Sequence, residues 1–374
     1  MRTAEVRPLL DPRLSTLCGW ITIACVVSLR TALCRQLGIA YPVFSVGMGM
    51  GAPPELAAAV SNAGGFGVLG SDGLSPEQIP QTVERTRQLT ARPFGVNFII
   101  APLEDPDGSE EDKAEVRQLV EAAIAERVAA IVLFWGDAGP FIEAAHRNRV
   151  KVLLQVGSVQ EAQTAADAGV DAVIAQGVEA GGHVRGTTPI WELLPAVVEA
   201  VRPVPVLASG GIGDGAGLAR ALGLGAQGVS LGTRFVASDE AWIHPAHKQR
   251  VVEGNAEDTV HGDLYDKWWP GAPHRTLRNR TYDEWEAAGR PPPGRRPGED
   301  ALIGQRGLVS GGVQDWPRYA VGIMTPSFQG EIERVPMATG ESCSVVNDIK
   351  PAAVIVRDLV REAQAALAEA DRLA

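Results

Sequence analysis

The chain has 374 residues, of which 45% are hydrophobic, 21% charged and 5% aromatic, an ordinary composition for a globular protein. Its 34 Lys and Arg against 45 Asp and Glu give a net charge of −11, which disfavours nucleic acid and anionic lipid as partners. The four cysteines form no CxxC pair, which disfavours a zinc site or disulfide framework and favours a reducing, cytoplasmic location.

Residues 1–29 are predicted to be an N-terminal extension outside the folded domain. They contain the apolar run LCGWITIACVVSL at 17–29, which is too short to span a membrane comfortably, so we expect no stable membrane insertion. Three interpretations stay open. The true start lies near Val26 or Val27, the run is a weak anchor helix, or it belongs to a signal peptide without a clear cleavage site.

From residue 40 onward, short apolar runs alternate with amphipathic stretches. The runs are continuous rather than alternating in polarity, which is typical of parallel strands covered on both faces. They predict eight strands, at 42–48, 67–70, 94–100, 129–135, 151–157, 172–177, 205–211 and 228–235. The stretches between and after them predict helices that include 53–64, 75–90, 158–169, 214–225 and a closing helix at 350–373.

This alternation predicts an α/β fold of the (β/α)8 TIM-barrel type. The alternative, an open doubly wound sheet, would call for GxGxxG after the first strand, and GMGMG at 47–51 only half resembles that fingerprint. The eighth strand is followed by a long polar segment instead of a helix. We therefore predict a barrel made of residues 30–235 and 345–374, with an insert at 236–344 that covers one barrel face as a lid.

Active sites in such barrels lie at the carboxyl ends of the strands, and two of these ends are rich in glycine. SGGIGDG at 209–215 follows strand seven, and SLGTRF at 230–235 ends strand eight, where barrels build phosphate sites from backbone N–H groups. Gly211 and Gly232 would let the backbone approach a phosphate, and Thr233 would add a hydroxyl. The alternative is that the glycines serve only tight turns.

Uncharged polar side chains occupy other strand ends, namely Met48, Asn97, Gln155 and Gln176. Amide side chains both donate and accept hydrogen bonds, as the pyrimidine edge of a flavin requires. Each residue alone is more typical of a core hydrogen-bond partner. Together with a phosphate site at strands seven and eight, they favour FMN as the cofactor, and no P-loop is present for a nucleoside triphosphate.

The stretch AQGVEAGGHVRG at 175–186 places His183 directly after Gly181 and Gly182. Either the histidine is a surface residue on a loose turn, or the glycines make room for a ligand that the imidazole touches. An imidazole with an ordinary pKa of about 6.5 can take a carbon-bound proton or hold an anion by a hydrogen bond. Glu179 is expected to brace this loop.

The other notable side chains receive structural interpretations. His244 and His247 in HPAH could form a metal pair, but no third ligand is evident, so a helix start at the surface is preferred and no metal is expected. Trp268–Trp269 is expected to anchor the insert or to form a contact in a homo-oligomer.

Several segments, in order over about residues 30–365, resemble the nitronate monooxygenase family, formerly called 2-nitropropane dioxygenase. They are FSVGMGMGAPPELAAAVSNAGGFGVLG, FGVNF, LLQVGSVQEAQTAADAGVDAVIAQGVEAGGH, LASGGIGDG, GVSLGTRF and GEIERVPMATGESCSVVNDIKPA. The resemblance implies an FMN-dependent TIM barrel that oxidises alkyl nitronates with O₂ to carbonyl compounds and nitrite.

Carried over by position, the resemblance implies that His183 is the catalytic base or substrate-binding residue. It implies FMN contacts at Asn97, Gln176, Gly181, Gly211, Ser230, Leu231, Gly232 and Thr233, with Met48 against the isoalloxazine; Gln155 and Gly182 join this predicted set. The stretch ATGESCS at 338–344 departs from the family pattern and leaves the substrate open. Two alternatives remain: an FMN-dependent NAD(P)H reductase of the same barrel family, acting on enoyl-acyl carriers or quinones, and a non-catalytic flavin binder.

Overall fold

The structure, a computed structural model, describes residues 29–308 and 311–373. The predictions for the N-terminal extension therefore lie outside the described residues, apart from Leu29, which is buried. No helix within the described ranges is both long enough and apolar enough to cross a bilayer.

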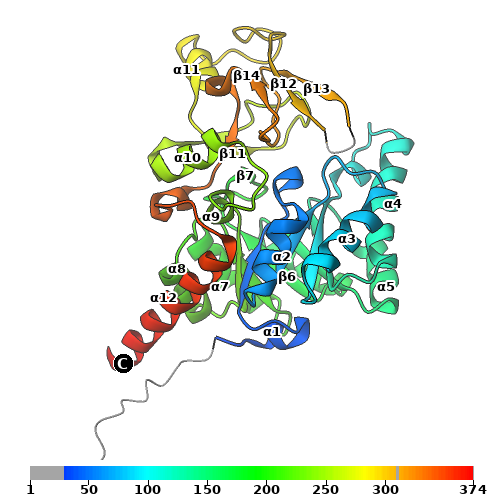
Figure 1. The fold of residues 1–374 in the computed structure, drawn as a ribbon, viewed down its shortest axis with the longest axis vertical. Coiled ribbons are helices and arrows are strands. Elements are labelled where there is room, and N and C mark those ends of the chain that lie inside the picture. Colours follow the sequence, from blue (N-terminus) through cyan, green and yellow to red (C-terminus); the bar gives the residue numbers. More distant parts are fainter. Residues whose placement is uncertain (1–28, 309–310, 374) are drawn as a thin grey trace, which may run out of the picture.

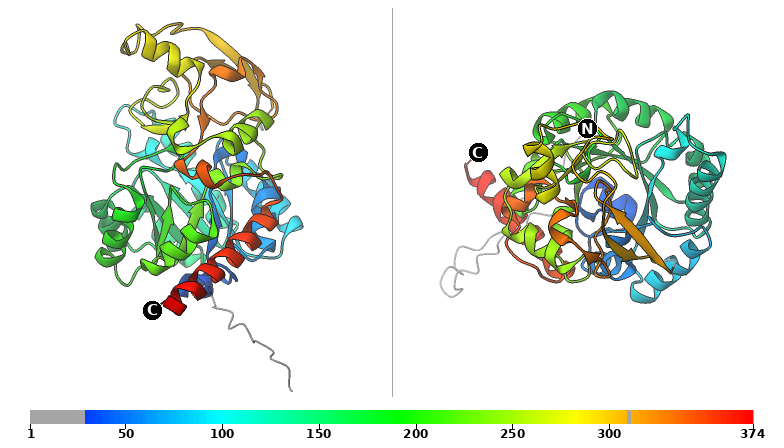
Figure 2. Two further views of the ribbon diagram at one scale, coloured as in Figure 1. Left: turned by 90° about the vertical axis from the view of Figure 1, so that its left-hand side faces the viewer. Right: turned by 90° about the horizontal axis from the view of Figure 1, so that it is seen from above.

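Eight parallel strands form the barrel at the centre of the molecule, and helices surround it (Figures 1 and 2). The strands run in the order β1-β9-β8-β6-β5-β4-β3-β2, and a bridge between Phe44 and Phe66 brings β1 back to β2. The predicted TIM barrel is confirmed. Its strands are β1 Val43–Ser45, β2 Gly67–Gly70, β3 Phe94–Ile99, β4 Ala130–Phe134, β5 Lys151–Val156, β6 Ala172–Gln176, β8 Val206–Ser209 and β9 Gly228–Leu231.

Three of the strands, β1, β8 and β9, end two or more residues before their predicted carboxyl ends. β1 stops before the 3-10 turn η1, Gly49–Gly51. β8 stops at Ser209 because Gly210 and Gly211 adopt φ angles of +94° and +68°. β9 stops at Leu231 because the next residues form the short helix α9, Thr233–Val236. All three corrections fall where the chain leaves the sheet to form the site.

The outer helices are held by local caps and by close packing. Ser158 accepts a hydrogen bond from the backbone N of Glu161 at the start of α6, and Asp214 accepts one from Gly217 N at the start of α8. Gly215 packs so closely on α12 that a side chain there would overlap Glu362. The helices are α1 Ala32–Leu37, α2 Pro54–Asn62, α3 Gln78–Leu89, α4 Glu110–Ala125, α5 Gly139–Arg147, α6 Val159–Ala168, α7 Ile190–Ala200, α8 Gly215–Gly223 and α12 Ala352–Leu373.

The insert, residues 236–344, is a folded layer above one end of the barrel (Figure 1). Trp316, Met324 and Phe328 belong to an apolar core within it. One of its sheets has the order β10-β11-β15, and the other β13-β12-β14. Its elements are α10 Pro245–Glu253, β10 Thr259–Gly262, β11 His274–Leu277, α11 Arg280–Ala287, β12 Leu302–Gly307, β13 Val313–Pro317, β14 Gln329–Gly330 and β15 Met337–Ala338, with η5 Glu341–Val345 leading to α12.

The insert is tied to the barrel by a two-residue strand, β7 Gly182–His183, which leaves the loop after β6. β7 pairs antiparallel with β11, so that His183 lies opposite His274 and Gly182 opposite Arg275. The predicted histidine therefore belongs to the sheet of the insert although it follows a barrel strand. Whether the insert acts as a lid stays a prediction.

Candidate functional site

A cavity of about 1330 Å³ lies at the carboxyl ends of the barrel strands, between the barrel and the insert. Leu231 does not line it and packs instead in the apolar core. The other predicted site residues all line it: Met48, Asn97, Gln155, Gln176, Gly181, Gly182, His183, Gly211, Ser230, Gly232 and Thr233. The fold thus brings together residues that are separated by up to 185 positions in the sequence, from Met48 to Thr233.

The two predicted phosphate glycines differ in what they do. Gly211 has a left-handed φ of +68°, so the turn itself requires a glycine there. Gly232 has a φ of −97°, and a Cβ built on it would meet only Val46, at 3.9 Å. A side chain at 232 would therefore occupy space beside the cavity rather than strain the fold. Next to it, the Thr233 hydroxyl accepts a hydrogen bond from Gly340 N at 2.9 Å and keeps its proton for a ligand.

The amide side chains on the cavity wall differ in how many hydrogen bonds they form within the protein. Gln176 Nε2 donates to the carbonyl of His183 at 2.9 Å, and its Oε1 accepts from Arg185 N at 3.2 Å, so this residue holds the histidine loop. Asn97 Nδ2 donates to Val132 O at 3.0 Å. The side chain of Gln155 forms no hydrogen bond with any described residue, which leaves both ends of its amide to a ligand.

The two glycines before His183 are required by the protein's own fold, Gly181 by close packing and Gly182 by its backbone conformation. A side chain at Gly181 would overlap the backbone of Thr339 and Gly340, and Gly182 has a φ of +73°. Gly181 therefore makes room for the chain that enters η5, and its predicted contact with FMN stays a prediction. Glu179 accepts hydrogen bonds from Ile190 N at 3.0 and 3.1 Å, so its predicted bracing role is confirmed.

His183 is enclosed by aromatic rings, which excludes the interpretation of a loose surface turn. The centroid of its imidazole lies 4.3 Å from Trp269, 5.9 Å from His274 and 6.4 Å from Trp135. Its Nε2 is buried and has no hydrogen-bond partner. Burial, with a contribution from the charge of His274, lowers the pKa of His183 to about 3. The imidazole is therefore neutral at physiological pH.

Trp135 follows β4 with a φ of +63°, a conformation that is costly for a bulky side chain. It lines the cavity, lies 5.1 Å from Trp269 between ring centroids and stacks under the guanidinium of Arg185 at 5.4 Å. Arg185 is fixed in turn by an ion pair with Glu161. The strained tryptophan thus forms an aromatic wall next to His183, a role that its position at a strand end did not reveal.

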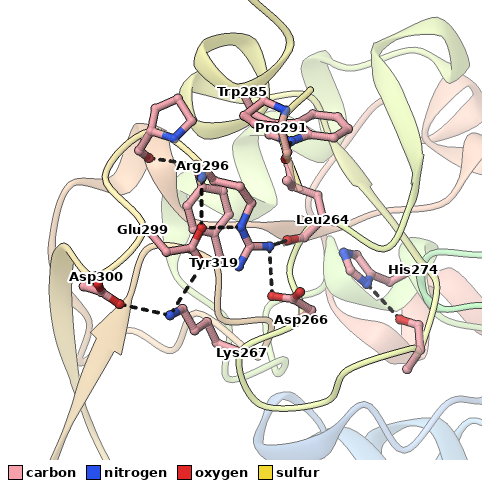
Figure 3. Close-up of polar contacts among 12 residues, drawn as sticks. Leu264, Asp266, Lys267, His274, Trp285, Pro291, Arg296, Glu299, Asp300 and Tyr319 are labelled. Carbon is pink, nitrogen blue, oxygen red and sulfur yellow. Dashed lines mark hydrogen bonds and ion pairs between the residues drawn. The ribbon is translucent and has the colours of Figure 1, made fainter. Parts of the chain in front are cut away.

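Trp269 follows a stretch of chain that ion pairs fix to the rest of the insert. Figure 3 shows the ion pairs of Asp266 and Lys267. Asp266 pairs with Arg296 at 2.9 Å, and Lys267 lies 3.5 Å from Glu299. On the far side of the loop, His274 Nδ1 contacts the carbonyl of Ala272 at 3.1 Å. The ion pairs thus hold the loop on the amino-terminal side of the tryptophan.

The histidines of HPAH separate into two roles. His244 caps α10, where its Nδ1 accepts from Ala246 N at 3.1 Å. His247 was wrongly predicted at the surface: it is 2% exposed, lines the cavity and places Nε2 at 3.2 Å from both Ala338 O and Thr339 Oγ1. Burial lowers its pKa to about 4. Among the described residues, no three His, Cys, Asp or Glu side chains gather as metal ligands would.

Sequence reasoning missed Arg306, a buried residue on β12 that lines the cavity from the side of the insert. β12 pairs with β13 and β14, and none of these strands was predicted. Without them, nothing in the sequence distinguishes Arg306 from an arginine in a loop.

Comparison with known proteins agrees with this architecture. A family model described as nitronate monooxygenase matches residues 30–362. A 5-hydroxy-7a-methyl-1-oxo-octahydro-1H-indene-4-carboxyl-CoA dehydrogenase of Rhodococcus jostii is 34% identical over 262 residues, 70% of this chain and 69% of the relative. A probable nitronate monooxygenase of Staphylococcus saprophyticus is 31% identical over 68% of this chain and 80% of its own length. The structure of FabK from Thermotoga maritima superposes with a TM-score of 0.73 and 30% identity, covering 92% of this chain and 99% of FabK.

Proposed function

This chain belongs to the nitronate monooxygenase family, and on that premise we propose that it binds FMN and oxidises alkyl nitronates with O₂ to carbonyl compounds and nitrite. Membership of the family makes the chain a flavin-dependent oxidoreductase with a TIM barrel. The identity of the flavin, the nitronate substrate and the use of O₂ are the proposal.

One observation carries the proposal: a single cavity joins the glycine turns after β8 and β9 to the buried imidazole of His183. The glycine turns suit the phosphate end of a mononucleotide, and the imidazole suits the reacting end of a small acid. A phosphate binder without catalysis would need the first feature only.

The residues present fit FMN. Gly232, whose Cβ would enter open space, and the Thr233 hydroxyl would hold the phosphate, with Ser230 beside them. Gln155, with its amide uncommitted, and Asn97 would meet the polar edge of the ring system. When bound, FMN would supply the electron transfer of the reaction.

His183 would handle the proton. Its Nε2 has no partner and its ring is neutral at physiological pH, so it can accept the carbon-bound proton of a nitroalkane. Its N–H tautomer can instead donate a hydrogen bond to an oxygen of the nitronate. Gln176 fixes the backbone carbonyl of the same residue and so keeps the imidazole in place.

The absorption spectrum of the purified protein tests this proposal. We expect a flavin spectrum that is bleached by anaerobic propyl nitronate, and nitrite as a product once air is admitted. The protein should release FMN rather than another flavin when it is denatured. A colourless protein that does not take up added FMN contradicts the proposal at its first step.

A second candidate is an NAD(P)H-dependent reductase on the same barrel, and the likeness to FabK and to a carboxyl-CoA dehydrogenase favours it. Anaerobic addition of NADH or NADPH separates the candidates. Rapid bleaching by a nicotinamide, without bleaching by propyl nitronate, would favour the reductase.

A further inference from the structure

Five arginines are buried in the described part of the chain, and four of them are neutralised by carboxylates. The exception is Arg306 on β12, which is 6% exposed and forms no ion pair with any described residue. The other four pair as follows: Arg234 with Asp348, Arg275 with Glu341, Arg296 with Asp266 and Glu299, and Arg318 with Glu284. A buried charge without a counter-charge is costly, so the fifth arginine needs a reason.

The guanidinium of Arg306 is held in one orientation. Its Nε donates to Gln314 Oε1 at 2.8 Å, and its Nη1 donates to Ile323 O at 2.9 Å. The rings of Trp268 and Trp316 lie 5.2 and 5.0 Å from it. Its Nη2 makes no hydrogen bond to a described residue, so two N–H donors stay available on a preorganised group.

The neighbouring tryptophan is itself held in place. Trp268 directly follows Lys267, which pairs with Asp300 at 3.3 Å and with Glu299 (Figure 3). This network therefore fixes one of the two rings that orient the guanidinium.

Arg306 is also the only arginine or lysine of the described chain that lines the cavity. The cavity's carboxylates are Asp72, Glu104, Asp105, Asp107, Asp112 and Glu115. Asp72 interacts with the Arg306 charge but not within ion-pair distance. An anionic group that enters this cavity therefore has one cationic side chain to bind, and that side chain is fixed on the wall formed by the insert.

We propose that Arg306 binds an anionic group, a carboxylate or a phosphate, carried by the substrate. The inference rests on the proposed function only in treating this cavity as the substrate site. With about 1330 Å³, the cavity exceeds the roughly 300–1,000 Å³ of a typical ligand site, so it has room beyond a flavin for a substrate with a second polar end. A charge-assisted hydrogen bond from Nη2 would fix that end at the insert and leave the reacting carbon to His183.

Calorimetric titration of the flavin-loaded protein with unreactive probes tests the site. The probes are glutarate, inorganic phosphate, coenzyme A and the neutral glutaramide. We expect at least one anionic probe to bind and glutaramide not to bind. Arg306→Met should weaken anion binding roughly tenfold or more, and Arg306→Lys should restore part of it. Arg280→Gln, which removes an exposed arginine paired with Glu284 from the same insert, should change nothing.

The probes also identify the source of the anion. Tighter binding of glutarate than of phosphate or coenzyme A indicates a small carboxylate substrate, and tighter binding of coenzyme A indicates a phosphate of a thioester. The inference is overturned if no anion binds to the wild type, or if both Arg306 variants bind the anions as the wild type does. Nitrite release from propyl nitronate is measured separately, so a protein that turns over nitronate without binding these anions loses this inference alone.

Discussion

His183 is uncharged because aromatic rings take the place of the water molecules that would hydrate its imidazole. The contacts with Trp269 and His274 remove the hydration that would stabilise an imidazolium, and they lower its pKa to about 3. A base must be unprotonated to accept a proton, so the same burial keeps the acceptor form populated at every ordinary pH, while the lowered pKa makes the imidazole a weaker base.

Replacement of His183 by alanine should lower kcat/KM for 1-nitropropane by roughly 10²–10⁴-fold, the usual contribution of a general base. Propyl nitronate has already lost the carbon-bound proton, so with this substrate the variant should lose only a hydrogen bond. The flavin spectrum should persist, because His183 contributes no part of the glycine turns that would hold the phosphate. Steady-state nitrite release and the flavin content per chain measure the two effects. Undiminished turnover in a flavin-loaded variant would remove the histidine from the mechanism.

Trp269→Ala should expose the imidazole and raise the pKa of His183 from about 3 towards its ordinary value. The neutral form exists only above that pKa, so the acid limb of kcat/KM should lie near pH 3 in the wild type and move upward in the variant. Pairs of pH–rate profiles show the displacement. Trp285→Ala is a control on a ring of α11 that does not line the cavity. Identical profiles for Trp269→Ala and the wild type would contradict the prediction.

Substitutions of Gly232 and Gly181 form a matched pair of tests for the cofactor site. Gly232→Ala adds a methyl group that meets only Val46, at 3.9 Å, so stability should hold while FMN affinity falls. Gly181→Ala drives a methyl group into the Thr339–Gly340 backbone, so it should lower the melting temperature with or without FMN. Thermal melts and FMN titrations of both variants separate packing from cofactor binding. Equal FMN affinity in Gly232→Ala and the wild type would contradict a phosphate at this turn.

At the scale of single residues, the sequence could predict which residues lie together at the cavity but not the contacts that each of them makes. Gly211, Gly232 and His183 were placed at strand ends by the barrel pattern, and they do line one cavity. The packing of Gly181 on Gly340 and the burial of His247 depend on chain that is distant in sequence, which no local pattern reveals.

At the scale of elements, α10 places an uncharged histidine of the insert on the wall of the cavity. Burial lowers the pKa of His247 to about 4, below the roughly 6.5 of an unfolded chain, so the unfolded state binds more protons between these values. The contribution of His247 is complete above about pH 6.5 and is lost as the pH falls towards 4.

The free energy of unfolding should therefore fall by about 1.4 kcal/mol per pH unit from His247 across this window. His247→Gln, which cannot take up the proton, should show a shallower decline between pH 6.5 and 4. Urea unfolding at a series of pH values measures both slopes. Parallel slopes in the two proteins would show that the histidine titrates alike in both states.

The barrel strands could be predicted because each is a continuous apolar run, as burial on both faces requires. Strands β12 and β13 of the insert could not, because they are polar on one side: β13 reads VQDWP, and its pairing with β12 is set by the apolar core around Trp316. α9 was taken for the end of a strand because TRFV is as suitable for a strand as for a single helical turn.

At the scale of the whole molecule, the barrel and the insert share the cavity, so a ligand that binds there should stabilise both. FMN at 100 times its Kd adds about 2.7 kcal/mol to the free energy of unfolding, which raises the melting temperature by several degrees. Thermal melts of the apoprotein with FMN, and with riboflavin as the analogue without phosphate, measure the gain. Equal shifts with the two compounds would contradict a phosphate site at β8 and β9.

The pairing of β7 with β11 has a consequence for anyone who would re-engineer substrate choice by exchanging residues 236–344. His274 and His183 are paired across these two strands. An insert taken from a relative would bring its own residues to this pairing and would change the position of the imidazole. An exchange of the insert therefore changes substrate selectivity and the placement of the proton acceptor together. Variant libraries of the insert should keep residues 274–277 constant.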